Sequence, residues 1–339
     1  MNLSALFVTV ITLFAVHEAS ACCAVSMRGS AVVNADQKVI LLWDQAKQTQ
    51  HFIRQANFRT AGESVGFLVP TPTRPQLEES GNDAFPYMAS ITTPKEPMHL
   101  TIPFGCSAMP RDSNGVRVIE EKTVAGYETV VLAADSGKGL IAWLNAHGYA
   151  YTKEAAAWAE PYLTTGWFIT AMKLAKPSKG SPAGPATGLA AAALRITFKT
   201  DRPLFPYREP DSRADAASLG VTRRSLRIYF VAEARYEGHF LSGPAWSGHV
   251  LWSRPLSNGQ RSELLQKLQL PATTGPAKFW LTAFTDAWPY GIAPGDVYFR
   301  PAATQRKLGA YSTPASMDPV LPALLALGLI RPWVKRRRR

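Results

Sequence analysis

Residues 38–43 read KVILLW, and this stretch does most to decide the fold. Because successive side chains of a strand point to opposite faces, the unbroken apolar run predicts a strand that is covered on both sides. Shorter strand patterns surround it, at residues 30–34, 49–54, 66–69, 98–102, 116–122 and 127–133. Prolines at positions 70, 72, 75, 86, 94 and 97 predict that residues 70–97 form a loop.

Two short helices are predicted between strands. One, at about 136–147, begins at the natural N-cap Ser136 and ends before Gly148. The other, at about 153–160, ends near Pro161. Further strands are expected at 167–174, 194–200, 225–234 and 279–285, and a short helix at 261–268. The predicted class is α+β, mainly antiparallel β-sheet with a few short helices.

The composition, 46% hydrophobic and 18% charged, predicts a globular body with a full core. A Gly-, Pro- and Ser-rich segment at 175–188 (AKPSKGSPAGPATG) predicts a flexible linker or long loop. It separates an N-terminal α+β part, residues 22–174, from a C-terminal β-rich part, residues 189–310. Whether the two parts form one domain or two is left open.

The first 21 residues (MNLSALFVTVITLFAVHEASA) predict a cleavable signal peptide. The apolar run from Leu3 is too short to cross a bilayer comfortably, and it closes on the small-x-small pattern Ala19-Ser20-Ala21. Cleavage between Ala21 and Cys22 is expected. Lipidation of Cys22 and an uncleaved buried helix are the alternatives.

The other end predicts a short membrane anchor at 320–334, followed by a basic cytoplasmic tail at 335–339 (KRRRR). The apolar residues 320–330 would span roughly 16 Å as a helix, about half the hydrocarbon thickness. Arg331 and the tail carry much of the net charge of +12, so the charge indicates an anchor and no nucleic-acid partner is expected. Removal of the tail after sorting is the alternative.

The cysteines are Cys22, Cys23 and Cys106, all in the part expected to be exported. A disulfide from Cys22 or Cys23 to Cys106 is predicted, because adjacent cysteines pair only in a strained ring. One thiol is then left over, and lipidation of Cys22 would leave Cys23–Cys106. Reversible redox chemistry at this pair is a further reading.

No motif predicts a metal or a cofactor. The chain has no His-x-x-x-His or Cys-x-x-Cys pair, and residues 135–139 (DSGKG) lack the first glycine and the spacing of a phosphate loop. The histidines of the mature chain are His51, His99, His147, His239 and His249. Two pairs of glutamates are adjacent in sequence, Glu78 with Glu79 and Glu120 with Glu121. His239 and His249 are ten residues apart across a Gly/Pro loop, a spacing that permits convergence at a metal site, but they are expected to be solvated or hydrogen-bonded loop histidines. The glutamates are expected to lie on solvated faces.

Asp44 and His51 flank a predicted turn, so a hairpin could bring a carboxylate close to an imidazole. If they met in a pocket, His51 would serve as a general base that Asp44 orients. The more common arrangement is a turn aspartate beside a surface histidine.

Several segments, taken in order, resemble the bacterial exported family named domain of unknown function 2330. They are ACCAV at 21–25, NADQKVILLWD at 34–44, HFIR at 51–54, GFLVPTP at 66–72, AWL at 142–144, GY at 148–149 and GWF at 166–168. The resemblance runs from about residue 22 to 300. It implies no established activity, cofactor or catalytic residue.

The expected function is that of an uncharacterised, non-enzymatic envelope protein, tethered by its C-terminal segment, that binds or scaffolds a partner outside the cytoplasm. The ligand or protein partner stays unknown. The alternative is an extracytoplasmic hydrolase whose site is assembled from distant residues such as Asp44 and His51.

Overall fold

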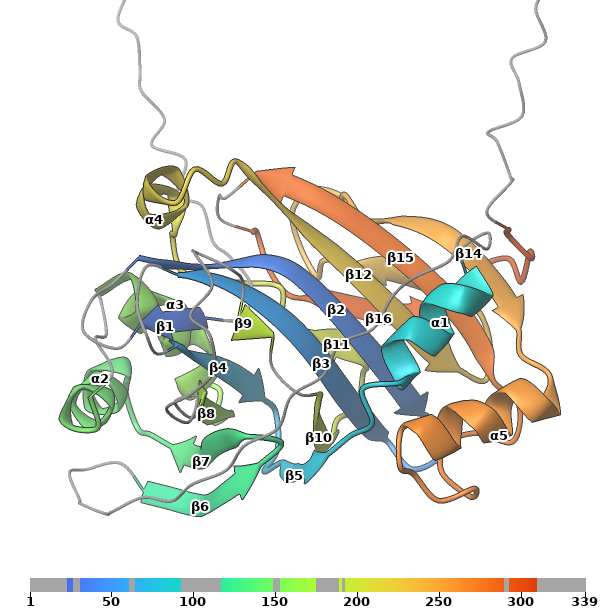
Figure 1. Cartoon of the computed structure of the whole chain (residues 1–339), viewed down its shortest axis with the longest axis horizontal. Helices are drawn as coiled ribbons and strands as arrows, with labels where there is room; N and C mark the ends of the chain where they lie inside the picture. The colour runs from blue at the N-terminus through green and yellow to red at the C-terminus, as the bar shows by residue number, and fades with distance from the viewer. Residues whose placement is uncertain are drawn as a thin grey trace, which may run out of the picture.

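The computed structural model describes residues 23–26, 31–60, 65–92, 117–148, 153–174, 189–190, 193–289 and 293–309. Within these ranges the chain forms three β-sheets and short helices, and the strand pairs are antiparallel except for β2 with β12. The predicted α+β class with mainly antiparallel sheet is confirmed (Figure 1).

An eight-stranded sheet forms the centre of the molecule. Its order is β14 (His249–Pro255), β15 (Trp280–Pro289), β12 (Arg223–Ala232), β2 (Val32–Asp44), β3 (Thr49–Thr60), β10 (Leu194–Lys199) and β5 (Gln76–Glu79), and β9 (Leu189–Ala190) pairs with β3. Because β10 and β12 pair with β3 and β2, this sheet joins segments from both sides of residues 175–188.

Two smaller sheets accompany it. The five-stranded sheet has the order β1 (Cys23–Ser26), β4 (Val65–Thr71), β8 (Phe168–Leu174), β7 (Tyr127–Ala133) and β6 (Arg117–Val124). The three-stranded sheet has the order β11 (Leu204–Phe205), β16 (Val297–Pro301) and β13 (Tyr236–His239). The helices are α1 (Ala84–Thr92), α2 (Gly137–Ala146), α3 (Lys153–Leu163), α4 (Arg213–Ser218) and α5 (Asn258–Lys267).

The sheets and helices stack in layers (Figure 1). One face of the large sheet, with Leu41 and Phe52, shares a buried cluster with Val131 of β7 and Phe299 of β16. Its other face, which carries Leu42, is covered by apolar residues of α1 and α5 (Phe85, Met88 and Leu264) and by Leu268, the C-cap of α5. The outer face of the five-stranded sheet is covered by α2 and α3, through Leu140, Trp143 and Trp158. The strand at 38–43 therefore has apolar neighbours on both faces, as its sequence predicts.

The predicted helix at 136–147 is confirmed as α2. Its N-cap Ser136 accepts a hydrogen bond from the backbone N–H of Gly139 at 3.2 Å, which satisfies one donor of the first turn. Glu160 of α3 accepts from the N–H of Gly137 at 2.9 Å. Helix α3 runs through Pro161 to Leu163, beyond the predicted end, because a proline in the last turn removes a single helical hydrogen bond.

The prediction of a loop over residues 70–97 is wrong for part of the segment that the structure describes. Residues 76–79 form the edge strand β5, and residues 84–92 form α1. Pro75 precedes the strand, and Pro86 stands in the first turn of the helix, where its missing N–H has no intrahelical partner to lose. The two strands expected at 30–34 and 38–43 are one strand, β2, with a register shift between Asn34 and Asp36.

Several predictions lie outside the described residues. They are the signal peptide, the strand at 98–102, the segment 175–188, the anchor at 320–334 and the basic tail. Cys22 and Cys106 are outside as well, so the disulfide stays a prediction. In the parts of the chain that the structure describes, no helix is both long and apolar enough to cross a membrane.

Candidate functional site

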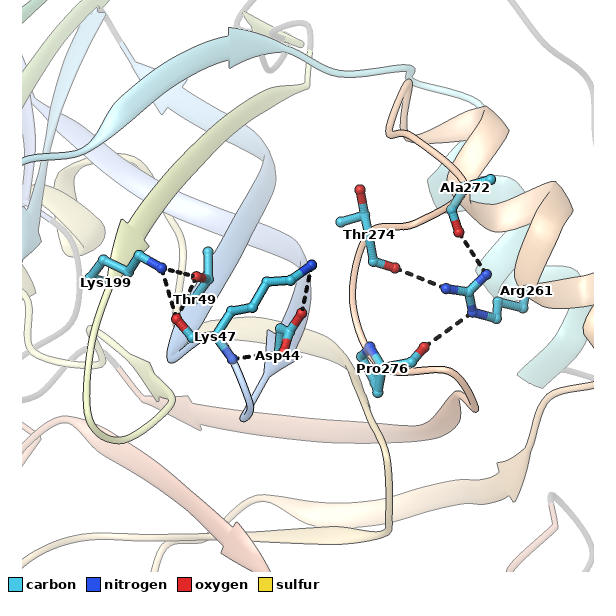
Figure 2. Close-up of polar contacts among 8 residues, drawn as sticks. All are labelled: Asp44, Lys47, Thr49, Lys199, Arg261, Ala272, Thr274 and Pro276. Atoms are coloured by element: carbon cyan, nitrogen blue, oxygen red, sulfur yellow. Dashed lines mark hydrogen bonds and ion pairs between the residues drawn. The ribbon is translucent and has the colours of Figure 1, made fainter.

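An open depression of about 700 Å³ lies at the end of the large sheet where β2 turns into β3. It is lined by Asp44, Gln45, Ala46, Lys47, Glu233, Gly275, Pro276 and Ala277. Three segments that are far apart in sequence thus contribute to it: the β2–β3 turn, the end of β12, and the loop between α5 and β15. Figure 2 shows the polar contacts that shape the first and third of these segments.

The β2–β3 turn is fixed by its own side chains. The carboxylate of Asp44 accepts from the backbone N–H of Lys47 at 3.0 Å and lies 3.5 Å from the Lys47 ammonium. Lys199 of β10 donates to the carbonyl of Lys47 at 2.8 Å and to the hydroxyl of Thr49 at 2.9 Å (Figure 2). The Asp44 side chain is 6% exposed and that of Lys47 is 61% exposed, so a buried carboxylate lies beneath a solvent-exposed ammonium.

Glu233 reaches the depression through the parallel pairing of β2 and β12. The register places Leu42 opposite Val231. Asp44 and Glu233 each follow these paired residues by two positions. Because the two strands are parallel, both carboxylates lie at the same end of the sheet. The hydroxyl of Tyr236 donates to Glu233 at 2.7 Å and to Gln45 at 3.3 Å, which joins this residue to the turn. Burial, reinforced by Glu233, raises the pKa of Tyr236, so the phenol keeps the proton that it donates.

The third wall is the loop 271–278. Gly275 has φ of +74°, and a β-carbon there would lie 3.0 Å from the ring of Phe279 and 3.3 Å from Leu42. The backbone conformation and the close approach both favour glycine. The loop thereby rests on the sheet beside Leu42, close to where Asp44 leaves β2.

His51 lies on the same face of the sheet as Asp44, but the two side chains bond to different groups. Strand pairing sets His51 opposite Leu42 and Asp44 opposite Thr49. The imidazole Nδ1 is 2.9 Å from the Thr197 hydroxyl, whereas the Asp44 carboxylate binds Lys47. His51 is also not among the residues that line the depression. The structure therefore does not provide an imidazole oriented by Asp44 in a pocket.

Burial, and next the guanidinium of Arg195, lower the pKa of His51 from 6.5 to about 4. The folded state thus binds fewer protons at this residue than the unfolded state does between these two pH values. Wild-type stability should fall as pH decreases from about 6.5 to about 4, by up to about 1.4 kcal/mol per pH unit. We expect His51→Gln to flatten this dependence in urea denaturation across that range. An unchanged slope, or an NMR titration of His51 near pH 6.5, would contradict the prediction.

The other described histidines are not among the residues that line the depression. His239 is in β13 of the three-stranded sheet and His249 is in β14 of the large sheet. His147 ends α2 and stacks on Trp143 at a centroid distance of 3.8 Å, and His99 is outside the described residues. Across the described ranges, no three His, Cys, Asp or Glu side chains group as ligands for a metal ion.

Two of the paired glutamates form ion pairs. Glu78 of β5 binds Arg195 at 2.9 Å, and Glu120 of β6 contacts Arg74 at 3.2 Å. Within each pair, the neighbouring residue on the strand (Glu79 or Glu121) points to the opposite face. The pairs are therefore not acid/base dyads.

Sequence reasoning named Asp44 but missed Glu233 and the wall at 275–277. The dipeptide Gly275-Pro276 is a turn signal, so a loop was detectable there. Nothing local indicates that Glu233 approaches Asp44, because that proximity depends on the pairing of β2 with β12.

The fold defines an α+β protein in which helical layers cover stacked, mainly antiparallel sheets, with an open polar depression at one sheet end. The chain belongs to the family described as uncharacterised proteins conserved in bacteria, domain of unknown function 2330, whose sequence profile matches residues 16–262. The resemblance noted from the sequence is confirmed. The match includes the β2–β3 turn and Glu233 and ends before the loop 271–278.

No curated protein sequence matches the chain. Among solved structures, the crystal structure of baculovirus P35 is similar over 85% of this chain and 98% of that chain. The sequence identity is 9% and the TM-score is 0.35, which is too low to assign a shared fold.

Proposed function

We propose that this chain is an exported envelope protein whose folded part binds a ligand or partner outside the cytoplasm through the depression beside the β2–β3 turn. Support for export comes from the signal pattern that ends at Ala21-Cys22, and support for a tether comes from residues 320–334 followed by the basic tail. We expect no nucleic-acid partner.

The observation that carries the binding role is the depression itself. Its lining combines carboxylates, an ammonium and an amide with the small surfaces of Gly275, Pro276 and Ala277. Such a lining offers hydrogen-bonding groups but no nucleophile paired with an oriented base. A binding role therefore fits the depression better than hydrolysis does.

A thermal-shift screen tests the binding role on the full mature protein. The panel should hold soluble envelope components of three chemical classes: oligosaccharides, short peptides and inorganic phosphate. A ligand at 100 times its Kd stabilises the folded state by about 2.7 kcal/mol, which raises Tm measurably.

The variant Ala277→Trp should abolish the shift of a ligand that lies against the loop wall, because Ala277 lines the depression and is exposed, so an indole there enters the depression without disturbing the core. The matched control is Ala217→Trp on the exposed side of α4, which packs near the other end of β2. A shift that persists in Ala277→Trp would move binding away from the depression. A panel that produces no shift with any class would contradict the proposal.

Export and tethering need a separate measurement. Intact mass and thiol counts on membrane and soluble fractions should give a chain that begins at Cys22, is found in the membrane fraction and retains residues 320–339. A mature chain that still carries Met1 would contradict export, and a chain that lacks the tail would contradict the anchor.

A further inference from the structure

Arg261 of α5 has an unusual set of acceptors. Its guanidinium donates to three backbone carbonyls of one loop: Ala272 at 2.9 Å, Thr274 at 3.1 Å and Pro276 at 3.2 Å (Figure 2). The same group lies 4.7 Å from the centroid of the Phe279 ring. No carboxylate contacts it among the ion pairs of the described residues, so its charge is balanced by peptide dipoles and an aromatic face.

The helix that carries Arg261 is itself firmly placed. Ser257 and Gln260 form a capping box at its start. Leu264 and Leu265 are buried under the large sheet. The backbone of Arg261 is therefore held in place by the core, and the loop is the part that its guanidinium holds.

The loop has little other polar attachment. Within it, the N–H of Thr274 donates to the carbonyl of Pro271 at 2.9 Å. Of the hydrogen bonds that the structure gives for residues 272–276, those reaching another element all come from Arg261. Gly275 adds the apolar contact with Phe279 and Leu42.

We propose that Arg261 is the positioning residue of the depression. Arg261 does not line the depression itself. Its hydrogen bonds fix how far the wall formed by Gly275, Pro276 and Ala277 stands from the β2–β3 turn, and a ligand would bind between the two. The expected effect on ligand affinity rests on the proposed function: binding does not have to supply the free energy of ordering the loop if the loop is already ordered. The positioning itself is a property of the unliganded protein.

The geometry requires arginine. A guanidinium has five N–H donors in one plane and so spans three carbonyls that are two residues apart in sequence. A lysine ammonium is a compact point charge at the end of a flexible stem, and it cannot reach all three acceptors together. Arg261→Lys should therefore behave like Arg261→Ala at the loop although it retains the charge.

Hydrogen exchange on the full mature protein tests the proposal without any ligand. In both variants, the amide of Thr274, which is hydrogen-bonded to the carbonyl of Pro271, should exchange about tenfold faster or more, while amides of β2 and β12 keep their wild-type protection. Millimolar methylguanidinium should restore protection in Arg261→Ala by occupying the vacated position. The matched control is Arg300→Ala, which removes an exposed arginine bound to Glu237 and should leave the loop unchanged.

Wild-type exchange at the amide of Thr274 in both variants would overturn the proposal. So would a uniform rise across the chain that methylguanidinium does not reverse, because that pattern assigns Arg261 to global stability. A thermal-shift panel that finds no ligand would contradict the proposed function and leave the exchange result standing. The two failures are therefore distinguishable.

Discussion

Glu209→Ala is expected to lower the free energy of unfolding by about 3–5 kcal/mol. The carboxylate of Glu209 forms an ion pair with Arg224, and their side chains are 4% and 1% exposed. Gln37 of β2 also donates to Glu209, at 2.8 Å. Removing the carboxylate takes from the buried Arg224 guanidinium the anion of this ion pair, and a buried charge that loses a counter-ion is costly.

Urea denaturation of wild type and variant measures the loss. The double variant Glu209→Leu/Arg224→Met should recover most of it, because two apolar side chains of similar volume carry no charge to desolvate. The matched control is Glu237→Ala, which breaks the exposed pair with Arg300 and should cost less than about 1 kcal/mol. A single variant as mild as this control would show that Arg224 is compensated by other groups.

Much of the fold was predictable because local patterns were strong. Three signals depend only on residues that are close in sequence: the apolar run at 38–43, the turn after Asp44 and the N-cap Ser136. Elements failed where a local signal had two meanings. Pro75 and Pro86 each indicate a loop when only the local sequence is considered. In the structure, Pro75 stands just before a strand and Pro86 stands in the first turn of a helix.

The candidate site was only partly predictable. The position of Asp44 can be predicted from the sequence because its strand ends in a recognisable turn. The residues that lie near Asp44 in the depression are placed there by long-range strand pairing. The register of Leu42 with Val231 brings Glu233 to Asp44 across most of the chain length. The contact of Gly275 with Leu42 depends in turn on where α5 packs. No periodicity in a single sequence encodes such a register, so Glu233 could not be predicted as a site residue.

The buried polar groups that connect the layers could not be predicted either, because their contacts also depend on residues that are far apart in sequence. Asp296 accepts three hydrogen bonds through one oxygen: from the Tyr162 hydroxyl at 2.8 Å, the Tyr207 N–H at 2.9 Å and the Arg208 N–H at 3.2 Å. Tyr162 is in α3 and Asp296 precedes β16, so this carboxyl connects the outer helical layer to the three-stranded sheet. In sequence, Pro294-Gly295-Asp296 is only a turn signal.

Asp296→Ala should therefore lower the free energy of unfolding by about 3 kcal/mol or more, because buried donors lose their acceptor at a cost of about 1–3 kcal/mol each. Asp296→Asn should be far milder at neutral pH. Its amide oxygen accepts the same three hydrogen bonds, and the side chain carries no charge into the interior. Urea denaturation of both variants at neutral pH measures the difference, and equal losses would show that the charge is needed.

The pH dependence separates the two roles of this carboxyl. Burial raises the pKa of Asp296 above its ordinary 3.8, an effect that the Arg208 cation opposes. The folded state thus binds more protons than the unfolded state between the ordinary and the raised pKa, so ionisation of Asp296 lowers stability as pH rises through that window. The groups that face it are Tyr162, Tyr207, Arg208 and Tyr298.

Asp296→Asn has no such group to titrate. The stability of this variant relative to wild type should therefore increase as pH rises above the ordinary pKa of 3.8, whatever the histidines contribute to both proteins. Urea denaturation of the two proteins at matched pH values measures this difference. A difference that stays constant across the range would mean that Asp296 titrates alike in the folded and unfolded chains. In that case the carboxyl acts only as an acceptor for the three donors, and its burial has no electrostatic cost.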